Sequence, residues 1–228
     1  GVESEDRELR LIRFDAQHRA DWGAAVVEVD VAAEEFTITD AFVDLKLGDD
    51  LVLRLGQQKE PNGLEQVSSV YGKTFVRSAG VSSTNSLDRR LGVSLRSYQD
   101  EWTLEAGAYA SNINEDDASD GWALAGRASW DEELGESHEN FLHFAGSVRH
   151  RESDGARFSY SEDAYSFAFG KSIKTSAIGD SDLFLGAEGA LVLGGFSLVG
   201  EASRTSVDCP SCASDPDFNA AYVDLSYV

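Results

Sequence analysis

Apolar and polar residues alternate along most of this chain, and this period of two constrains its fold more than any other feature. In the segment 121–130, Trp122, Leu124 and Trp130 share one face and Arg127 lies on the other. Successive side chains of a β-strand point to opposite faces, so the pattern predicts strands, and the helical period of 3.6 residues is almost absent. The chain is therefore expected to be all-β and antiparallel, with about eleven strands: 9–19, 22–31, 39–47, 51–58, 90–98, 102–110, 121–130, 141–150, 182–193, 196–204 and 218–228.

The connections between these segments alternate in length. Short turns lie at 48–50, 99–101 and 194–195, and the longer links are the loop that contains Pro61, the segments 112–120 and 151–181, and the loop that contains the two cysteines. The link 131–139 is an exception, because it is not especially short. Transmembrane barrels show this asymmetry because one rim carries turns and the other carries loops. The segment 151–181, which suits either an ordered loop or a short hairpin within one, must add zero strands or two to keep the parity of a ring. We expect zero.

Alternation alone leaves two architectures open, a transmembrane β-barrel and a soluble β-sandwich, because both have one apolar and one polar face. Three features favour the barrel. The apolar face is rich in Ala and Gly as well as Leu and Val, and the polar face carries both signs of charge along nearly every strand. Aromatic residues also lie at strand ends, as in the girdles of membrane barrels. They are Trp22, Tyr98, Trp102, Trp122, Trp130 and Tyr227.

Composition limits the partners and the compartment. A net charge of -22 opposes nucleic-acid binding, which needs a basic surface. No run approaches the ~18 apolar residues of a membrane-spanning helix. The dispersed glycines and three prolines mark no linker, so residues 1–228 are expected to form one domain. Cys209 and Cys212 form C-P-S-C, which suits a redox pair, half of a zinc site or a local disulfide; we favour the disulfide, in an oxidising compartment, because further zinc ligands are missing.

No catalytic motif is present. The four histidines lack H-E-x-x-H spacing and no G-x-S-x-G occurs, so we expect no enzyme and assign no catalytic residue, metal or cofactor. The acidic segment from Asn112 to Asp120, N-I-N-E-D-D-A-S-D, offers hard oxygen ligands at short spacing. It lacks the ordered calcium-loop pattern with a central Gly and a terminal Glu. A solvated loop and a weak surface calcium site both stay open for it.

One stretch carries a more specific signal. The run G-Q-Q-K-E-P-N-G-L-E-Q-V-S-S-V-Y-G-K-T-F-V-R-S, followed by R-R-L-G-V-S-L, resembles the phosphate-selective porin O and P family. That family has G-Q-x-K-E-P-x-G-L-E-x-x-x-S-S-x-Y-x-T-F-x-E-R-S followed by R-x-L-G-V. W-T-L-E-A-G-A-Y, G-W-A-L-A-G-R-A-S-W and L-G-G-F-S-L-V-G-E extend the resemblance over nearly the whole chain.

The resemblance implies an outer-membrane barrel of about 16 antiparallel strands, commonly trimeric, in contact with lipid and lipopolysaccharide. Such a barrel passes small anions through a constriction made by loops that fold inward, which places a constriction loop at 59–88. Because about eleven strands are readable, we expect a single barrel domain that is incomplete at both ends.

The resemblance also implies site residues. Ser68, Ser69 and Arg77 fall where the family has constriction-loop residues that contact anions; hydroxyls and a guanidinium replace part of an anion's hydration. We add Lys59 and Lys73, the latter from its charge and position in the loop alone. Two departures affect the aim of Arg77: Gly72-Lys73 puts two residues between Tyr71 and Thr74 where the family has one, and Val76 stands where Glu commonly precedes the arginine.

Strand parity predicts which charges face the interior. The expected cations are Arg13, Lys46, Arg54, Arg90, Arg96, Arg127 and Arg149, with slightly more carboxylates on the same face. Such a mixture predicts weak or cation-leaning selectivity. The function expected from the chain is passive diffusion of small ions and solutes, phosphate or other anions among them, across the bacterial outer membrane. The alternative is a soluble β-sandwich that binds calcium or glycans.

Overall fold

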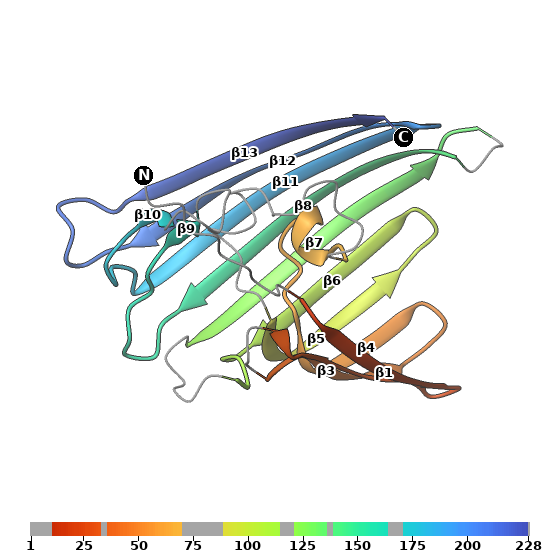
Figure 1. The fold of residues 1–228 in the computed structure, drawn as a ribbon, viewed down its shortest axis with the longest axis horizontal. Helices are drawn as coiled ribbons and strands as arrows, with labels where there is room; N and C mark the ends of the chain where they lie inside the picture. The colour runs from red at the N-terminus through yellow and green to blue at the C-terminus, as the bar shows by residue number, and fades with distance from the viewer. Residues whose placement is uncertain are drawn as a thin grey trace, which may run out of the picture.

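A single antiparallel sheet dominates the computed structural model, which describes residues 11–32, 36–69, 89–114, 121–135, 139–163 and 171–227 (Figure 1). The sheet has eleven strands in the order β1-β2-β3-β4-β5-β6-β7-β8-β11-β12-β13, which confirms the predicted number. Their bounds are β1 (Arg13–Ala20), β2 (Gly23–Asp30), β3 (Thr37–Lys46), β4 (Leu51–Lys59), β5 (Arg89–Tyr98), β6 (Trp102–Tyr109), β7 (Trp122–Glu133), β8 (Asn140–Glu152), β11 (Ser181–Leu193), β12 (Phe196–Asp208) and β13 (Asp217–Tyr227).

Three short elements lie outside this sheet: a four-residue helix, α1 (Leu64–Val67), and the paired strands β9 (Ser161–Asp163) and β10 (Lys171–Lys174). Strand β8 pairs directly with β11, so the segment 151–181 adds no strand to the main sheet, as predicted, and instead contains a hairpin. The pattern of alternation missed α1. No helix in the described ranges has the length and apolar character needed to cross a membrane.

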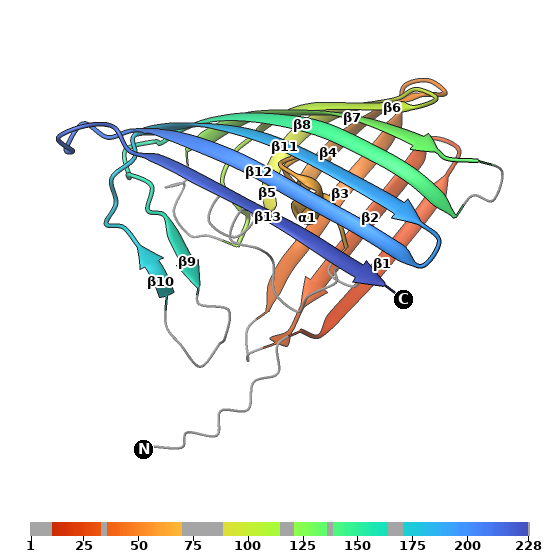
Figure 2. The same cartoon turned by 90° about the horizontal axis from the view of Figure 1, so that it is seen from above.

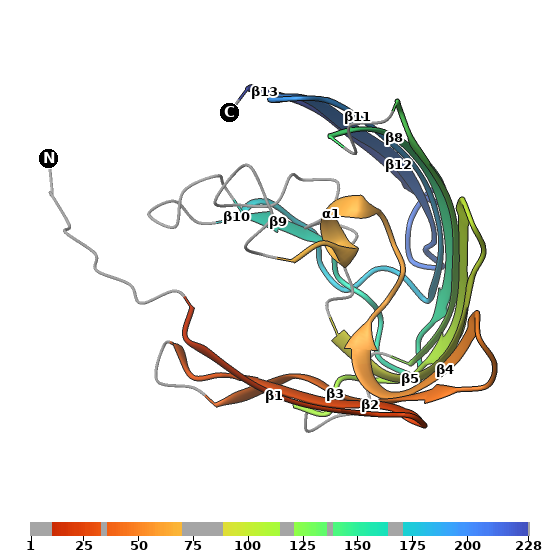
Figure 3. The same cartoon turned by 90° about the vertical axis from the view of Figure 1, so that its right-hand side faces the viewer.

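The sheet curves into an arc, with β1 at one edge and β13 at the other (Figure 3). Helix α1 and the β9–β10 hairpin both lie on the concave side of this arc, as Figures 2 and 3 show. Among the described strands, β1 and β13 have one partner strand each, so the eleven strands form an open, barrel-like wall.

Long and short connections separate onto the two rims of the wall. One rim carries the links 31–36, 60–88, 110–121, 153–180 and 209–216, and the other carries 21–22, 47–50, 99–101, 134–139 and 194–195. The link predicted at 131–139 is shortened because β7 continues to Glu133, beyond the predicted end at Trp130. The shortest connections therefore lie on the second rim, as in membrane barrels, while 134–139 on that rim and 31–36 on the first are equal in length.

The polarity of exposed and buried side chains in the wall is the reverse of that in a soluble domain. Large apolar side chains on the convex face are exposed, among them Leu185 and Val223, the latter 74% exposed. The largest fully buried side chains are polar and include Arg90, Arg149 and Gln57. A β-sandwich buries its apolar face against a second sheet, and no second sheet covers the convex face in the described part of the chain. The sandwich alternative is therefore wrong.

A small apolar cluster attaches the β9–β10 arm to the rim of long links. Phe158, Tyr160 and Val207 are buried together, with Phe218 packed against them. The Tyr160 hydroxyl donates a hydrogen bond of 2.7 Å to Asp182, which also pairs with Arg151. Burial and the nearby Asp182 carboxylate raise the pKa of Tyr160, so the phenol stays protonated and available as a donor. These contacts attach the residues that precede β9 to strands β11, β12 and β13.

Candidate pore constriction

The chain that follows β4 turns onto the concave side of the sheet (Figure 3). Glu60, Pro61, Asn62 and Gly63 are all buried. The Asn62 amide donates a hydrogen bond of 2.8 Å to Glu60, and Arg90 on β5 lies 3.7 Å from the other Glu60 oxygen. Burial raises the pKa of Glu60, although the neighbouring arginines oppose that shift. A buried carboxyl group thus anchors the loop at its origin.

Helix α1 docks on the far side of the arc, on β12. The backbone N–H of Glu65 donates a hydrogen bond of 2.8 Å to Glu201, which also accepts a bond of 2.6 Å from the Tyr222 hydroxyl. Five strands separate β4 from β12 in the sheet order, so the segment bridges two distant strands of the concave face.

Gly63 makes this close approach possible. Its φ of 92° is a conformation that favours glycine, and a Cβ atom there would lie 2.5 Å from a Glu201 carboxylate oxygen. Both the backbone conformation and the contact with β12 therefore explain the glycine at this position.

The predicted anion-contact residues fall into two groups. Lys59 donates a hydrogen bond of 2.8 Å to the carbonyl of Ser68, and the Ser68 hydroxyl donates one of 2.6 Å to the carbonyl of Leu64. Ser69 is exposed and lines a cavity beside Lys59. Lys73 and Arg77 lie outside the described residues. The structure thus brings Lys59, Ser68 and Ser69 together. The hydroxyl proton of Ser68 is already used in the hydrogen bond to the helix carbonyl of Leu64.

Two cavities of different charge flank α1. The first, of about 410 Å³, lies beside Val67 and Ser69; the second, of about 370 Å³, lies beside Leu64 and Glu65. Arg127 and Thr103 border both. The first is lined by six basic residues, Arg13, Arg54, Lys59, Arg89, Arg96 and Arg127, and three acids, Glu28, Asp40 and Glu105. The second is lined by three acids, Glu65, Asp131 and Asp224, with Arg127 and His143.

The arginines predicted to face the interior lie on the concave face, and each lies beside a carboxylate. Arg54 holds Asp44 through two hydrogen bonds of 2.6 and 2.7 Å, a bidentate geometry. The other pairs are Arg13 with Glu28 and Asp30, Arg90 with Glu60, Arg96 with Glu105, Arg127 with Glu188, and Arg149 with Asp182. Pairing neutralises much of the field that a row of arginines would project into a pore.

His143 forms a cluster with two carboxylates that no catalytic motif in the sequence indicates. Its Nδ1 lies 2.6 Å from Asp131 and its Nε2 lies 3.0 Å from Glu188, which also pairs with Arg127. Carboxylates only accept hydrogen bonds, and only an imidazolium donates from both ring nitrogens, so the geometry fits a charged His143. His143 lies six residues from Arg149 on β8, so alternation along the strand is the one sequence signal that puts it on the same face.

The side-chain amides at the start of the acidic link after β6 form hydrogen bonds to the neighbouring strands β3 and β4. Asn112 accepts a hydrogen bond of 2.8 Å from Gln57, and Asn114 both donates to and accepts from the backbone of Ile38. The acidic residues 115–120 lie outside the described ranges. Within those ranges, no group of three or more His, Cys, Asp or Glu residues is placed to hold a metal ion.

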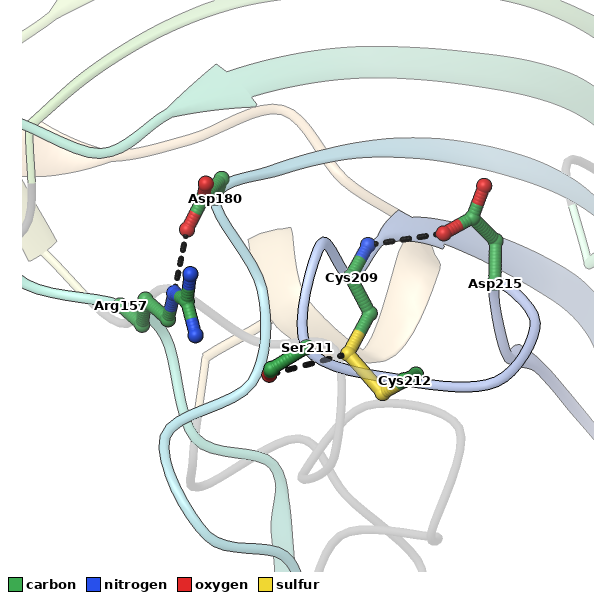
Figure 4. The surroundings of a disulfide bond; sticks show 6 residues. All are labelled: Arg157, Asp180, Cys209, Ser211, Cys212 and Asp215. Carbon is green, nitrogen blue, oxygen red and sulfur yellow. Dashed lines mark hydrogen bonds and ion pairs between the residues drawn. A yellow bond between two sulfur atoms is a disulfide. The ribbon is translucent and has the colours of Figure 1, made fainter.

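The C-P-S-C segment forms a tight turn between β12 and β13 (Figure 4). Cys209 and Cys212 are joined by a disulfide, with their Cα atoms 5.3 Å apart. The backbone N–H of Cys209 also donates a hydrogen bond of 2.9 Å to Asp215. This crosslinked turn lies on the rim of long links.

Solved structures show the same fold. The chain is similar to a loop L8 deletion mutant of OmpT, an outer membrane protein of Vibrio cholerae, with a TM-score of 0.59 and 13% identity over 95% of this chain and 67% of that one. Outer-membrane expressed OmpT of Vibrio cholerae gives a TM-score of 0.56 and 14% identity, over 93% of this chain and 61% of that one. Both likenesses support a transmembrane β-barrel architecture.

Sequence comparison identifies the family. An uncharacterized protein of Caulobacter vibrioides is 25% identical over 96% of this chain and 47% of its own length, so the chain spans about half of that relative. The family model described as "Phosphate-selective porin O and P" matches residues 10–228. Porins are proteins of the bacterial outer membrane, and the family together with these structural neighbours assigns the chain to that membrane. The chain belongs to the phosphate-selective porin O and P family.

Proposed function

We propose that these strands form part of the wall of a passive diffusion channel, and that the segment from Glu60 to Ser69 is part of its constriction. The observation that carries the proposal is the hydrogen bond from Glu65 to Glu201, which holds α1 across the concave face. A loop held there occupies part of the bore and leaves a separate cavity on each of its two sides. A porin family supports transport, and not catalysis, as the activity.

Small ions and solutes are the proposed cargo, with anions such as phosphate passing beside Lys59 and Ser69. The surplus of basic over acidic residues in the first cavity supports that route. The pairing of the wall arginines with carboxylates argues for modest selectivity, because a solute anion must compete with a carboxylate already in place. We therefore propose weak discrimination between phosphate and chloride.

The wall must be closed for this function. Unpaired backbone groups at the edges of β1 and β13 would be costly in hydrocarbon, where only closed sheets satisfy every N–H and C=O group. We propose that further strands pair with both edges and bring the ring to the 16 strands expected of the family, with lipid and lipopolysaccharide around it. Assembly into a homotrimer is a further proposal, which the family resemblance supports.

The test is electrical. The full-length protein, inserted into planar bilayers, should give stepwise single-channel conductance and a reversal potential close to zero in a potassium chloride gradient. Repeating the gradient with potassium phosphate compares the two anions directly. A protein that inserts and gives no conductance steps contradicts the channel, whereas a large shift toward the phosphate equilibrium potential contradicts weak selectivity alone.

A further inference from the structure

Helix α1 is held by a side chain that belongs to the opposite wall, and we infer that Glu201 is the positioning residue of the constriction, with Tyr222 orienting it. The inference rests on the proposed function and assigns to these two residues a task within it. Glu201 is buried and bonds to the loop, so we assign its effect on permeation to the placement of α1.

The N-terminus of α1 needs such a partner. The first N–H groups of a helix have no acceptor inside the helix, and Gly63, at the cap position, has no side chain to supply one. Glu201 supplies the acceptor from 136 residues further along the chain, through a charge-assisted bond of 2.8 Å to the N–H of Glu65. Capping from another element ties the position of the helix to that of the wall.

Glu201 depends on α1 in turn. The side chain is buried, and in the described part of the chain no basic group forms an ion pair with it. Its carboxylate is compensated by two donors, the N–H of Glu65 and the hydroxyl of Tyr222, which lies directly opposite on β13. A buried carboxylate that loses a donor becomes costly, so the docked loop is the favoured arrangement.

The site leaves α1 little freedom. Gly63 packs so closely on Glu201 that a single added carbon would collide with it, and Glu188 lies beside the same glycine while bound to Arg127 and His143. If the bond to Glu65 is lost, α1 can leave this seat and the cavities on its two sides join. The bore then widens and its size fluctuates as the loop moves.

Two substitutions of equal charge separate positioning from electrostatics. Glu201→Gln and Glu201→Ala each remove one negative charge, but glutamine keeps an oxygen that accepts from Glu65 and Tyr222. In single-channel recordings of the full-length protein, we expect Glu201→Gln to keep the steady wild-type conductance level. Glu201→Ala should lose that level and show rapid transitions to larger conductance. Tyr222→Phe should show the same transitions less often.

The matched control is Asp224→Asn, which removes a charge from the same side of the bore at a residue with no hydrogen bond to α1. It should keep the steady level. Equal, steady recordings from Glu201→Ala and Glu201→Gln would overturn the inference, as would transitions in Asp224→Asn. Circular dichroism checks that each variant keeps its β-sheet; if Glu201→Ala does not fold, Tyr222→Phe decides. Failure of the proposed function is distinct, because the wild type itself would then show no conductance.

Discussion

The ammonium group of Lys59 donates a hydrogen bond of 2.8 Å to the carbonyl of Ser68. The last residue of β4 is thereby joined to the residue that follows α1. Lys59 also lines the first cavity, so this contact holds a cation in its wall.

Replacing Lys59 with Met should lower the anion-to-cation permeability ratio roughly twofold, because one of the basic groups around the cavity is removed. Reversal potentials in a potassium chloride gradient measure this ratio. Lys59→Arg is the control, since it keeps the charge and a donor, and it should keep the wild-type ratio. An unchanged ratio in Lys59→Met would show that this cation lies outside the path of the ions.

Gly63→Ala should destabilise the protein by about 1–3 kcal/mol, because its φ of 92° and ψ of 155° form a region that is essentially restricted to glycine. Unfolding by urea in detergent micelles measures the loss. Gly135→Ala serves as the control: Gly135 has a φ of 84°, but no atom lies within 4 Å of an added Cβ. Only Gly63→Ala should also disturb the conductance, and an equal disturbance in both variants would contradict the contact with Glu201.

The stability of the loop anchor should depend on pH through Glu60. Its pKa is raised by burial above the ordinary 4.5, so its contribution to stability is complete below pH 4.5 and is lost as the pH rises through the raised value. Glu60→Gln removes this titration while keeping an acceptor for Asn62. The free energy of unfolding should therefore fall with rising pH more steeply in the wild type than in Glu60→Gln. Glu65→Gln, which keeps Glu60, should retain the wild-type dependence of the unfolding free energy on pH. The same dependence in all three proteins would contradict a raised pKa of Glu60 in the folded loop.

The two faces of the wall should respond oppositely to charge. Leu185→Lys places an ammonium group on the convex face and should cost about 2–4 kcal/mol if it lies near the bilayer midplane, less toward the rims. Val199→Lys, on the concave face, lines the second cavity near Asp224 and should cost much less. Unfolding in lipid vesicles compares the two. A larger loss for Val199→Lys would contradict the assignment of the convex face to lipid.

Much of the wall was predictable from local pattern. A period of two predicts the number of strands and the opposite faces on which Arg127 and Leu124 lie. The lengths of the links predict that longer and shorter connections lie on different rims. Strand ends were less predictable. The end of β7 was placed at Trp130 because the charged residues after it look like a link, yet hydrogen bonds to β8 continue the strand through Glu133.

The proposed constriction was predictable only in outline. The family resemblance located the loop and its serines, but Glu201, Tyr222 and His143 had no motif to distinguish them from the many other polar residues of the interior face. Glu60 lies within the run that resembles the family, but the resemblance does not show that it is buried beside Arg90, which depends on how the loop folds. No spacing rule connects Glu65 to a carboxylate 136 residues away.

Local chemistry thus sets which face of each strand is apolar and which is polar, because side chains alternate strictly along an extended backbone. The partners across the bore depend on how far the whole sheet curves. Glu65 meets Glu201 because β12 bends round to the loop that leaves β4, and that curvature is the sum of twist and pairing over every strand between them.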